Sequence, residues 1–184
     1  MASVLIAYGT VEGHTARIAD EMRESLAGAG HQARLLHVHD GREALPDDVD
    51  AVIVGGPIHT GHHEKALIAF AKAHRARLSA LPSGFFTVCL TALDDTQEAR
   101  AATAEYVQAF CDETGWTPRR TAVFAGRLAW TQYDFFTRLV MKLITRRHGG
   151  NDQDVKQDYD YTDYDAVRRF AAEVAGSVER TAVG

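Results

Sequence analysis

The feature that most constrains the fold is an alternation of short apolar runs with amphipathic stretches along the chain. The apolar runs are residues 3–8, 32–38, 50–56, 84–90 and 121–125. Each is short and bounded by polar residues or glycine, which predicts a buried strand. The stretches with apolar residues at helical spacing are 14–29, 64–78, 96–114 and 163–178. Strands that alternate with helices predict a doubly wound α/β domain around a five-stranded parallel sheet.

The composition predicts one domain, residues 1–184, with an ordinary hydrophobic fraction of 46% and no repeat or linker. A net charge of -5 argues against a dedicated nucleic-acid binder. The two cysteines, Cys89 and Cys111, lack the spacing of a zinc site and suit a reducing compartment. No run approaches the ~20 apolar residues of a membrane span, and the first residues do not resemble a signal peptide. We therefore expect a cytoplasmic protein.

The loop after the first predicted strand, GTVEGHT at residues 9–15, leads directly into a helix. The carboxyl end of a parallel strand and the start of a helix together favour phosphate binding. Thr10 and Thr15 offer hydroxyl groups, and Gly13 allows the backbone to approach a ligand closely. The loop has no lysine and no GxGxxG pattern, which excludes the common nucleotide and dinucleotide loops. It therefore indicates either a monophosphate site or an ordinary strand-to-helix turn.

Within this loop the pattern Tyr8-x-Thr10-x-x-Gly13-x-Thr15-x-x-x-Ala19 resembles the phosphate-loop signature of flavodoxins. The resemblance implies a flavodoxin-like fold with strand order 2-1-3-4-5 and FMN bound between the first and third strands. The residues that it implies at the FMN phosphate are Thr10, Val11, Glu12, Gly13, His14 and Thr15.

In a flavodoxin-like sheet, the loops after the third and fourth strands would border the flavin ring. The residues implied there are Pro57, Ile58, His59, Thr60 and Gly61, followed by Thr91, Ala92 and Leu93. His59, His62 and His63 lack the i, i+4 spacing of a helical metal site, so we expect no metal. One of the three could carry a proton, because imidazole exchanges protons near neutral pH. The sequence assigns no other catalytic residue.

A long segment, about residues 127–161, separates the fifth strand from the last helix and predicts a functional insertion. Its central run, FFTRLVMKLITRR at 135–147, places apolar residues on one arc of a helix and basic residues on the other. This pattern fits either a helix packed on the sheet or a helix at a membrane surface. We expect residues 133–148 to cap the flavin pocket and to contact the membrane.

Several pieces of the chain resemble the menaquinone-dependent protoporphyrinogen oxidase family, a flavodoxin-like group. The best-matching pieces are residues 138–144 (RLVMKLI), Gly149-Gly150 and Tyr161-Thr162-Asp163. The resemblance implies an FMN enzyme that oxidises protoporphyrinogen IX to protoporphyrin IX in haem biosynthesis. Its electrons would pass to a membrane quinone, and no nucleic acid would be involved.

The stretch after the fourth strand departs from this family, because residues 93–98 (LDDTQE) are acidic here and basic there. An acidic surface would repel the carboxylates of a porphyrinogen. Basic residues of the insertion could compensate: Arg127, Arg138, Lys142, Arg146 and Arg147. The alternatives are a flavodoxin-type electron carrier, another FMN-dependent quinone reductase, and a flavodoxin-like binding module without flavin.

Overall fold

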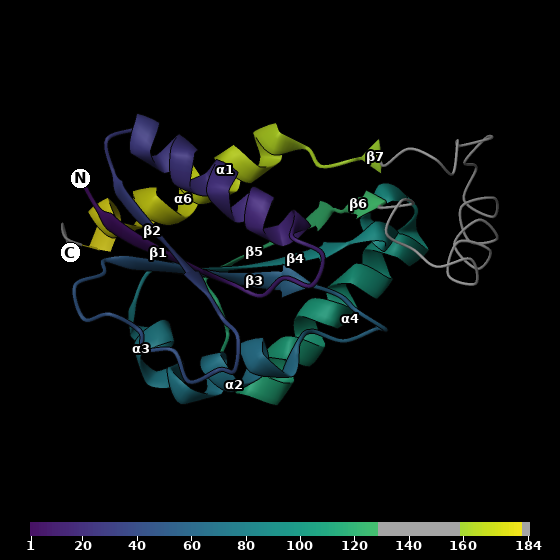
Figure 1. Cartoon of the computed structure of the whole chain (residues 1–184), viewed down its shortest axis with the longest axis horizontal. Coiled ribbons are helices and arrows are strands. Elements are labelled where there is room, and N and C mark those ends of the chain that lie inside the picture. The colour runs from purple at the N-terminus through teal and green to yellow at the C-terminus, as the bar shows by residue number, and fades with distance from the viewer. Residues whose placement is uncertain (129–158, 182–184) are drawn as a thin grey trace.

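The structure, a computed structural model, describes residues 1–128 and 159–181 (Figure 1). Its centre is a five-stranded sheet in the order β2-β1-β3-β4-β5, in which each neighbouring pair is parallel. The strands are β1 (Ser3–Tyr8), β2 (Gln32–His37), β3 (Ala51–Pro57), β4 (Ser83–Cys89) and β5 (Arg120–Ala125). The predicted fold class and strand order are confirmed.

Helices cover both faces of the sheet, so that the domain has three layers (Figure 1). On one face lie α1 (His14–Gly28) and α6 (Tyr164–Thr181). On the other lie α2 (Lys65–Ala73), α3 (Arg75–Ala80) and α4 (Gln97–Thr114). Each face has its own apolar core, one containing Ile18, Met22 and Phe170 and the other Leu67, Phe85 and Phe110.

The inner strands are buried on both faces, which explains their continuous apolar sequences. Every residue of β4 is buried, and β3 is buried from Ala51 to Gly56. The edge strand β2 alternates exposed and half-buried residues instead. A parallel sheet that is covered on both faces requires apolar side chains on both faces of its inner strands.

The predicted single helix at 64–78 is wrong, because the structure breaks it into α2 and α3 at His74. The His74 backbone lies at φ -105° and ψ 11°, outside helical values. Its ring donates a hydrogen bond from Nε2 to the carbonyl oxygen of Glu43, 2.8 Å away. The helix therefore breaks at a residue that contacts the β2–β3 connection, and the local sequence does not reveal this contact.

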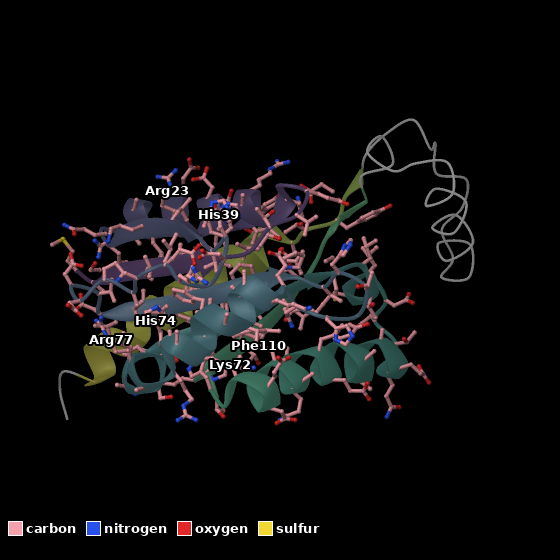
Figure 2. The ribbon with its side chains drawn as sticks, turned by 60° about the horizontal axis from the view of Figure 1, so that its bottom comes forward. Arg23, His39, Lys72, His74, Arg77 and Phe110 are labelled. Carbon is pink, nitrogen blue, oxygen red and sulfur yellow. The ribbon has the colours of Figure 1, made fainter. Side chains whose placement is uncertain are left out.

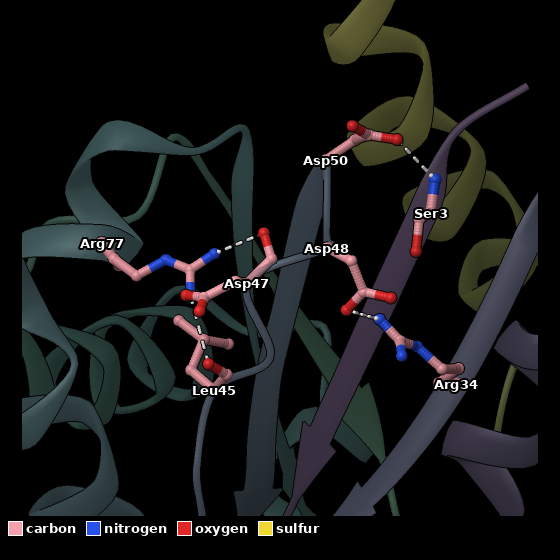
Figure 3. Close-up of polar contacts among 7 residues, drawn as sticks. All are labelled: Ser3, Arg34, Leu45, Asp47, Asp48, Asp50 and Arg77. Atoms are coloured by element: carbon pink, nitrogen blue, oxygen red, sulfur yellow. Dashed lines mark hydrogen bonds and ion pairs between the residues drawn. The ribbon is translucent and has the colours of Figure 1, made fainter.

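A second anchor for the β2–β3 connection comes from Arg77 of α3, which lies on the same side of the molecule as His74 (Figure 2). Its guanidinium donates to the carbonyl oxygens of Leu45 and Asp47, each at 3.1 Å, and to the Asp47 carboxylate at 2.7 Å (Figure 3). Asp48 accepts a hydrogen bond from Arg34 of β2 at 2.8 Å. This connection is held at the amino-terminal edge of the sheet, away from the edge where the phosphate loop lies.

A small second sheet marks the base of the insertion. The strand β6 (Arg127–Leu128) pairs in antiparallel orientation with β7 (Tyr159–Asp160). The predicted membrane-contacting segment 133–148 lies outside the described residues. Within the part of the chain that is described, no helix has the length and apolar character to cross a membrane.

His63 is a polar residue inside the apolar core that contains Leu67, Phe85 and Phe110, with only 7% of its surface exposed. Its Nε2 lies 3.0 Å from the hydroxyl of Thr87, and its ring contacts Phe85 and Phe110. Burial, and to a smaller extent the charge of His62, lowers the pKa of His63 from 6.5 to about 4. The folded protein therefore holds His63 neutral where the unfolded chain would protonate it.

Gly55 of β3 leaves room for a neighbouring aromatic ring, and we predict that Gly55→Ala destabilises the protein. A Cβ at this position would lie 2.2 Å from Cδ1 of Phe86 on β4. Overpacking of this kind costs about 1–3 kcal/mol in free energy of unfolding, measurable by urea denaturation. Gly28→Ala is the matched control, because an added Cβ there meets nothing within 4 Å. If both variants had the stability of the parent, the close approach would be contradicted.

The buried His63 predicts a loss of stability in acid. Its folded-state pKa is lowered, so its contribution is complete above pH 6.5 and is lost as pH falls toward 4. Over this window the shift amounts to about 3 kcal/mol of unfolding free energy. His63→Gln should flatten this part of the stability profile, measured by urea denaturation at several pH values. His62→Gln removes an exposed histidine whose charge is the smaller cause of the shift, so it should keep most of the parent slope; an unchanged slope in His63→Gln would refute the assignment.

Candidate functional site

A pocket opens at the carboxyl edge of the sheet, where β1 and β3 lie side by side and the direction of chain progression reverses. Such a reversal is the usual ligand site of open α/β sheets. The lining residues are Thr10, Val11, Glu12, His14, Thr15, Pro57, Ile58, His59, Val88, Cys89, Leu90 and Gly126. They come from the carboxyl ends of β1, β3, β4 and β5, so the sheet itself brings them together.

The loop after β1 has the geometry of a phosphate cradle. Gly13 adopts φ 79°, and its N–H donates to the Thr10 hydroxyl at 3.0 Å. This bond closes the loop immediately before α1 begins at His14. Among the described residues, no side chain caps the start of α1, and the first turn of this helix carries no acidic residue. The amide groups and the helix dipole are therefore available to an anion.

The loop after β3 is a tight hairpin. His59 and His62 exchange backbone hydrogen bonds of 2.9 and 3.1 Å, and Thr60 and Gly61 between them have φ values of 50° and 86°. Two central residues with positive φ are characteristic of a type I′ turn. The hairpin is joined to β4 by the bond from the Ile58 N–H to the Val88 carbonyl, at 2.9 Å. Its near side faces the pocket, whereas its tip at 60–61 is exposed.

The third side of the pocket differs from the sequence prediction. Val88, Cys89 and Leu90 line it, whereas the predicted Thr91, Ala92 and Leu93 are not among the lining residues. The reason is that a 3₁₀ helix, Leu90–Leu93, starts directly after β4. Burial raises the pKa of the Cys89 thiol, so this side chain stays protonated and contributes shape rather than a thiolate.

The structure places most of the residues predicted for the cofactor at the pocket wall. Those that line it are Thr10, Val11, Glu12, His14, Thr15, Pro57, Ile58 and His59. Gly13 donates its N–H to the Thr10 hydroxyl within the loop, and Thr60 and Gly61 form the tip of the hairpin. Gly126 was missed as a site residue, although its place after the last strand puts it at the same sheet edge.

Glu64 lies just behind the pocket, at the start of α2. A Cβ added to Gly9 would lie 3.1 Å from Glu64 Oε2, so the carboxyl group lies against the Gly9 backbone. Burial raises the pKa of Glu64, and the charge of His59 partly opposes this. Its Oε1 is buried with no hydrogen-bond partner within residues 1–128 and 159–181. A carboxyl group in this position tends to hold its proton more tightly than one in water.

The donor set of this pocket fits FMN. Thr10, Thr15 and the start of α1 offer hydroxyl and amide groups for one phosphate. Ile58 and Val88 offer apolar surface for a flat ring, and Val11 remains 56% exposed at the pocket wall, where a bound ring could cover it. Within the described ranges, no group of three His, Cys, Asp or Glu side chains could hold a metal ion.

Comparison with known sequences places the chain among flavodoxin-like proteins. The flavodoxin domain family matches residues 5–156. Two curated relatives are each named protoporphyrinogen IX dehydrogenase (quinone). The relative from Leishmania major is 36% identical over 172 residues, which cover 93% of this chain and 74% of that protein. The relative from Escherichia coli strain K12 is 34% identical over 171 residues, which cover 93% of each chain.

Solved structures agree on the fold. A short-chain flavodoxin associated with a PDU bacterial microcompartment has a TM-score of 0.59 at 12% identity, covering 97% of this chain and 99% of that one. Oxidised flavodoxin 1 from Bacillus cereus has a TM-score of 0.56 at 12% identity, covering 95% and 98%. With its phosphate cradle, its sheet order and these relatives, the chain belongs to the flavodoxin domain family and is an FMN-type oxidoreductase.

Proposed function

We propose that this protein oxidises protoporphyrinogen IX to protoporphyrin IX and passes the electrons to a quinone, as a step of haem biosynthesis. The observation that carries the proposal is the similarity to two proteins named for this activity over 93% of the chain. The match to the flavodoxin domain family, residues 5–156, includes both pocket loops. The pocket at the carboxyl edge of β1 and β3 supports it, because it offers the groups that FMN needs.

The proposed FMN site is divided between two parts of the pocket. Residues 10–15 would hold the phosphate through hydroxyl and backbone N–H groups, and residues 57–61 would border the ring. When bound, FMN supplies two-electron chemistry, because it accepts hydrogen with its electron pair from a donor and releases the electrons to an acceptor. The protein's own tasks are to orient the substrate, to exclude water and to receive protons.

Among the three histidines of the second loop, His59 is the best candidate for the proton acceptor. The conversion of a porphyrinogen to a porphyrin removes hydrogen from the meso carbons as well as from nitrogen. Each two-electron step that gives a hydride to the flavin also releases a proton, so a base near the flavin is useful. His59 and His62 are both exposed, but only His59 of the two lines the pocket, and His63 is turned into the core against Phe85 and Phe110. We therefore assign proton acceptance to the His59 imidazole.

A second candidate function is that of an electron carrier or of another FMN-dependent quinone reductase. The observation that favours it is the acidic surface after β4, where Asp95 and Glu98 are exposed. Arg100 offsets Asp95 through a hydrogen bond of 2.9 Å from its Nε. Acidic residues beside a flavin would disfavour a substrate with carboxylates and would favour a cationic partner, and the ion pair with Arg100 reduces this effect at Asp95.

Anaerobic incubation with protoporphyrinogen IX and a menaquinone analogue decides between these functions. We expect FMN-loaded protein to produce porphyrin fluorescence well above the spontaneous rate. His59→Gln should keep the flavin absorbance and lose about 100-fold in turnover, the typical size of a general-base contribution. His62→Gln is the matched control and should turn over like the parent. Fluorescence no faster than without protein would overturn the oxidase proposal in favour of the carrier.

We also propose that residues 133–148 contact the membrane from which the quinone arrives. The support is in the sequence: Arg138 and Lys142 alternate with apolar residues, as in helices that bind anionic lipid surfaces. Deletion of residues 133–150 should spare FMN binding and abolish co-sedimentation with anionic liposomes. A deletion protein that still sedimented with liposomes would contradict this proposal.

A further inference from the structure

The side chain of Glu64 reaches from one pocket loop to the other. Glu64 is the last residue before α2, where its backbone is extended at φ -61° and ψ 138°. A Cβ added to Gly9, the first residue after β1, would lie 3.1 Å from Oε2, 3.2 Å from Cδ and 3.4 Å from Oε1 of Glu64. The carboxyl group therefore lies against the Gly9 backbone, in room that a side chain at position 9 would take.

The carboxyl group of Glu64 is poorly suited to carry its charge. Glu64 stands at the position that caps α2, yet among the described residues its side chain makes no capping hydrogen bond. Its Oε1 is buried and has no hydrogen-bond partner within residues 1–128 and 159–181. A buried carboxylate without donors is costly, so the position favours a carboxyl group that carries a proton.

The segments around β1 and β3 bring no charge that acts on Glu64. Strand β3 has no titratable side chain. Tyr8, the last residue of β1, stacks on a histidine of β2, with ring centres 5.2 Å apart. In the loop after β1, Glu12 is exposed, and His14 contacts the Thr162 hydroxyl at 2.9 Å. Among the described residues, none of these side chains shifts the pKa of Glu64.

The segment that carries Glu64 supplies the one charge that acts on it in the part of the chain that is described. His63 is turned into the core and is held neutral, whereas His62 and Lys65 are exposed. Burial raises the pKa of Glu64, and the charge of His59 partly opposes this. Because His59 lines the pocket, this segment has two acid–base groups that act on each other, one at the pocket wall and one behind it.

We infer that Glu64 stores the proton that each oxidation of the substrate releases, until the electron acceptor takes it up. The inference rests on the proposed function and deepens it. In each two-electron step the substrate gives a hydride to the flavin and a proton to His59, from which the proton passes to a carboxylate oxygen of Glu64. The quinone then takes the hydride equivalent from the flavin and the proton from Glu64, which leaves a quinol and an ionised carboxylate.

Charge makes this storage favourable. A flavin that has accepted a hydride carries one more negative charge than before. Behind a pocket that excludes water, this charge raises the proton affinity of a nearby carboxyl group, because like charges disfavour the ionised form. Glu64 does not line the pocket, so it responds to the charge without touching the ring. Its proton affinity should rise on reduction and fall on reoxidation, as a temporary store requires.

The test measures the midpoint potential of the bound flavin at several pH values by spectroelectrochemical titration. A carboxylate that binds a proton on reduction makes the potential depend more steeply on pH. We expect the parent slope to exceed that of Glu64→Gln by up to about 30 mV per pH unit, the value for one extra proton per two electrons. The excess should be confined to the pH range in which Glu64 is ionised in the oxidised protein and protonated in the reduced one.

Two further variants separate the acid from its position. Glu64→Asp keeps a carboxyl group but withdraws it from Gly9 toward water, so the range of steeper slope should move to lower pH. Glu105→Gln, at an exposed glutamate of α4 that does not line the pocket, is the matched control and should keep the parent slope. The visible absorbance of the flavin shows that each variant retains a folded, loaded site. If Glu64→Gln loses the flavin, the comparison with Glu64→Asp decides.

The outcomes separate this inference from the proposed function. Equal slopes in the parent and in Glu64→Gln, or an unshifted range in Glu64→Asp, would overturn the role of Glu64. A steeper parent slope without porphyrin fluorescence above the spontaneous rate would refute the oxidase proposal and keep Glu64 as the proton store of a flavin electron carrier. A parent that bound no FMN would refute the flavin site and this inference together.

Discussion

Burial of the inner strands on both faces is the constraint on which the rest of the structure depends. Because β3 and β4 have no face that water can reach, helices must cover both sides of the sheet. Because neighbouring strands are parallel, each connection must return from the carboxyl edge of the sheet to its amino edge. The loops that follow β1, β3, β4 and β5 then meet at the carboxyl edge and line one pocket. The position of the site follows from the packing of the core.

The sequence predicts this architecture well, because strands buried on both faces appear as continuous apolar runs. The predicted strand ends agree with the structure within one residue. The features that the sequence does not reveal depend on tertiary contacts. The helix breaks at His74, where the imidazole ring donates a hydrogen bond to the carbonyl oxygen of Glu43. The strands β6 and β7 have two residues each and are too short to show any periodicity.

The residues of the pocket show the same difference between features that act locally and features that depend on tertiary contacts. The phosphate loop is recognisable because Thr10, Gly13 and Thr15 act locally, through their own hydroxyls and backbone. The contact between His14 and Thr162 cannot be read from the sequence, because the two residues lie 148 positions apart. The third wall of the pocket is formed by Val88, Cys89 and Leu90, whereas the sequence predicted Thr91, Ala92 and Leu93, and nothing in the sequence indicates that a 3₁₀ helix starts at Leu90.

The pairing of β6 with β7 has a consequence for how such a protein can diversify. The chain leaves the domain at Arg127 and re-enters at Asp160, and these two residues are partners in the small sheet. The segment between them therefore starts and ends at nearly one point, and the entropy of closing such a loop grows only slowly with its length. A change in the length or sequence of that segment therefore need not disturb the five-stranded sheet. The pair of β6 and β7 is a position at which related proteins can differ in this segment while they keep the same fold.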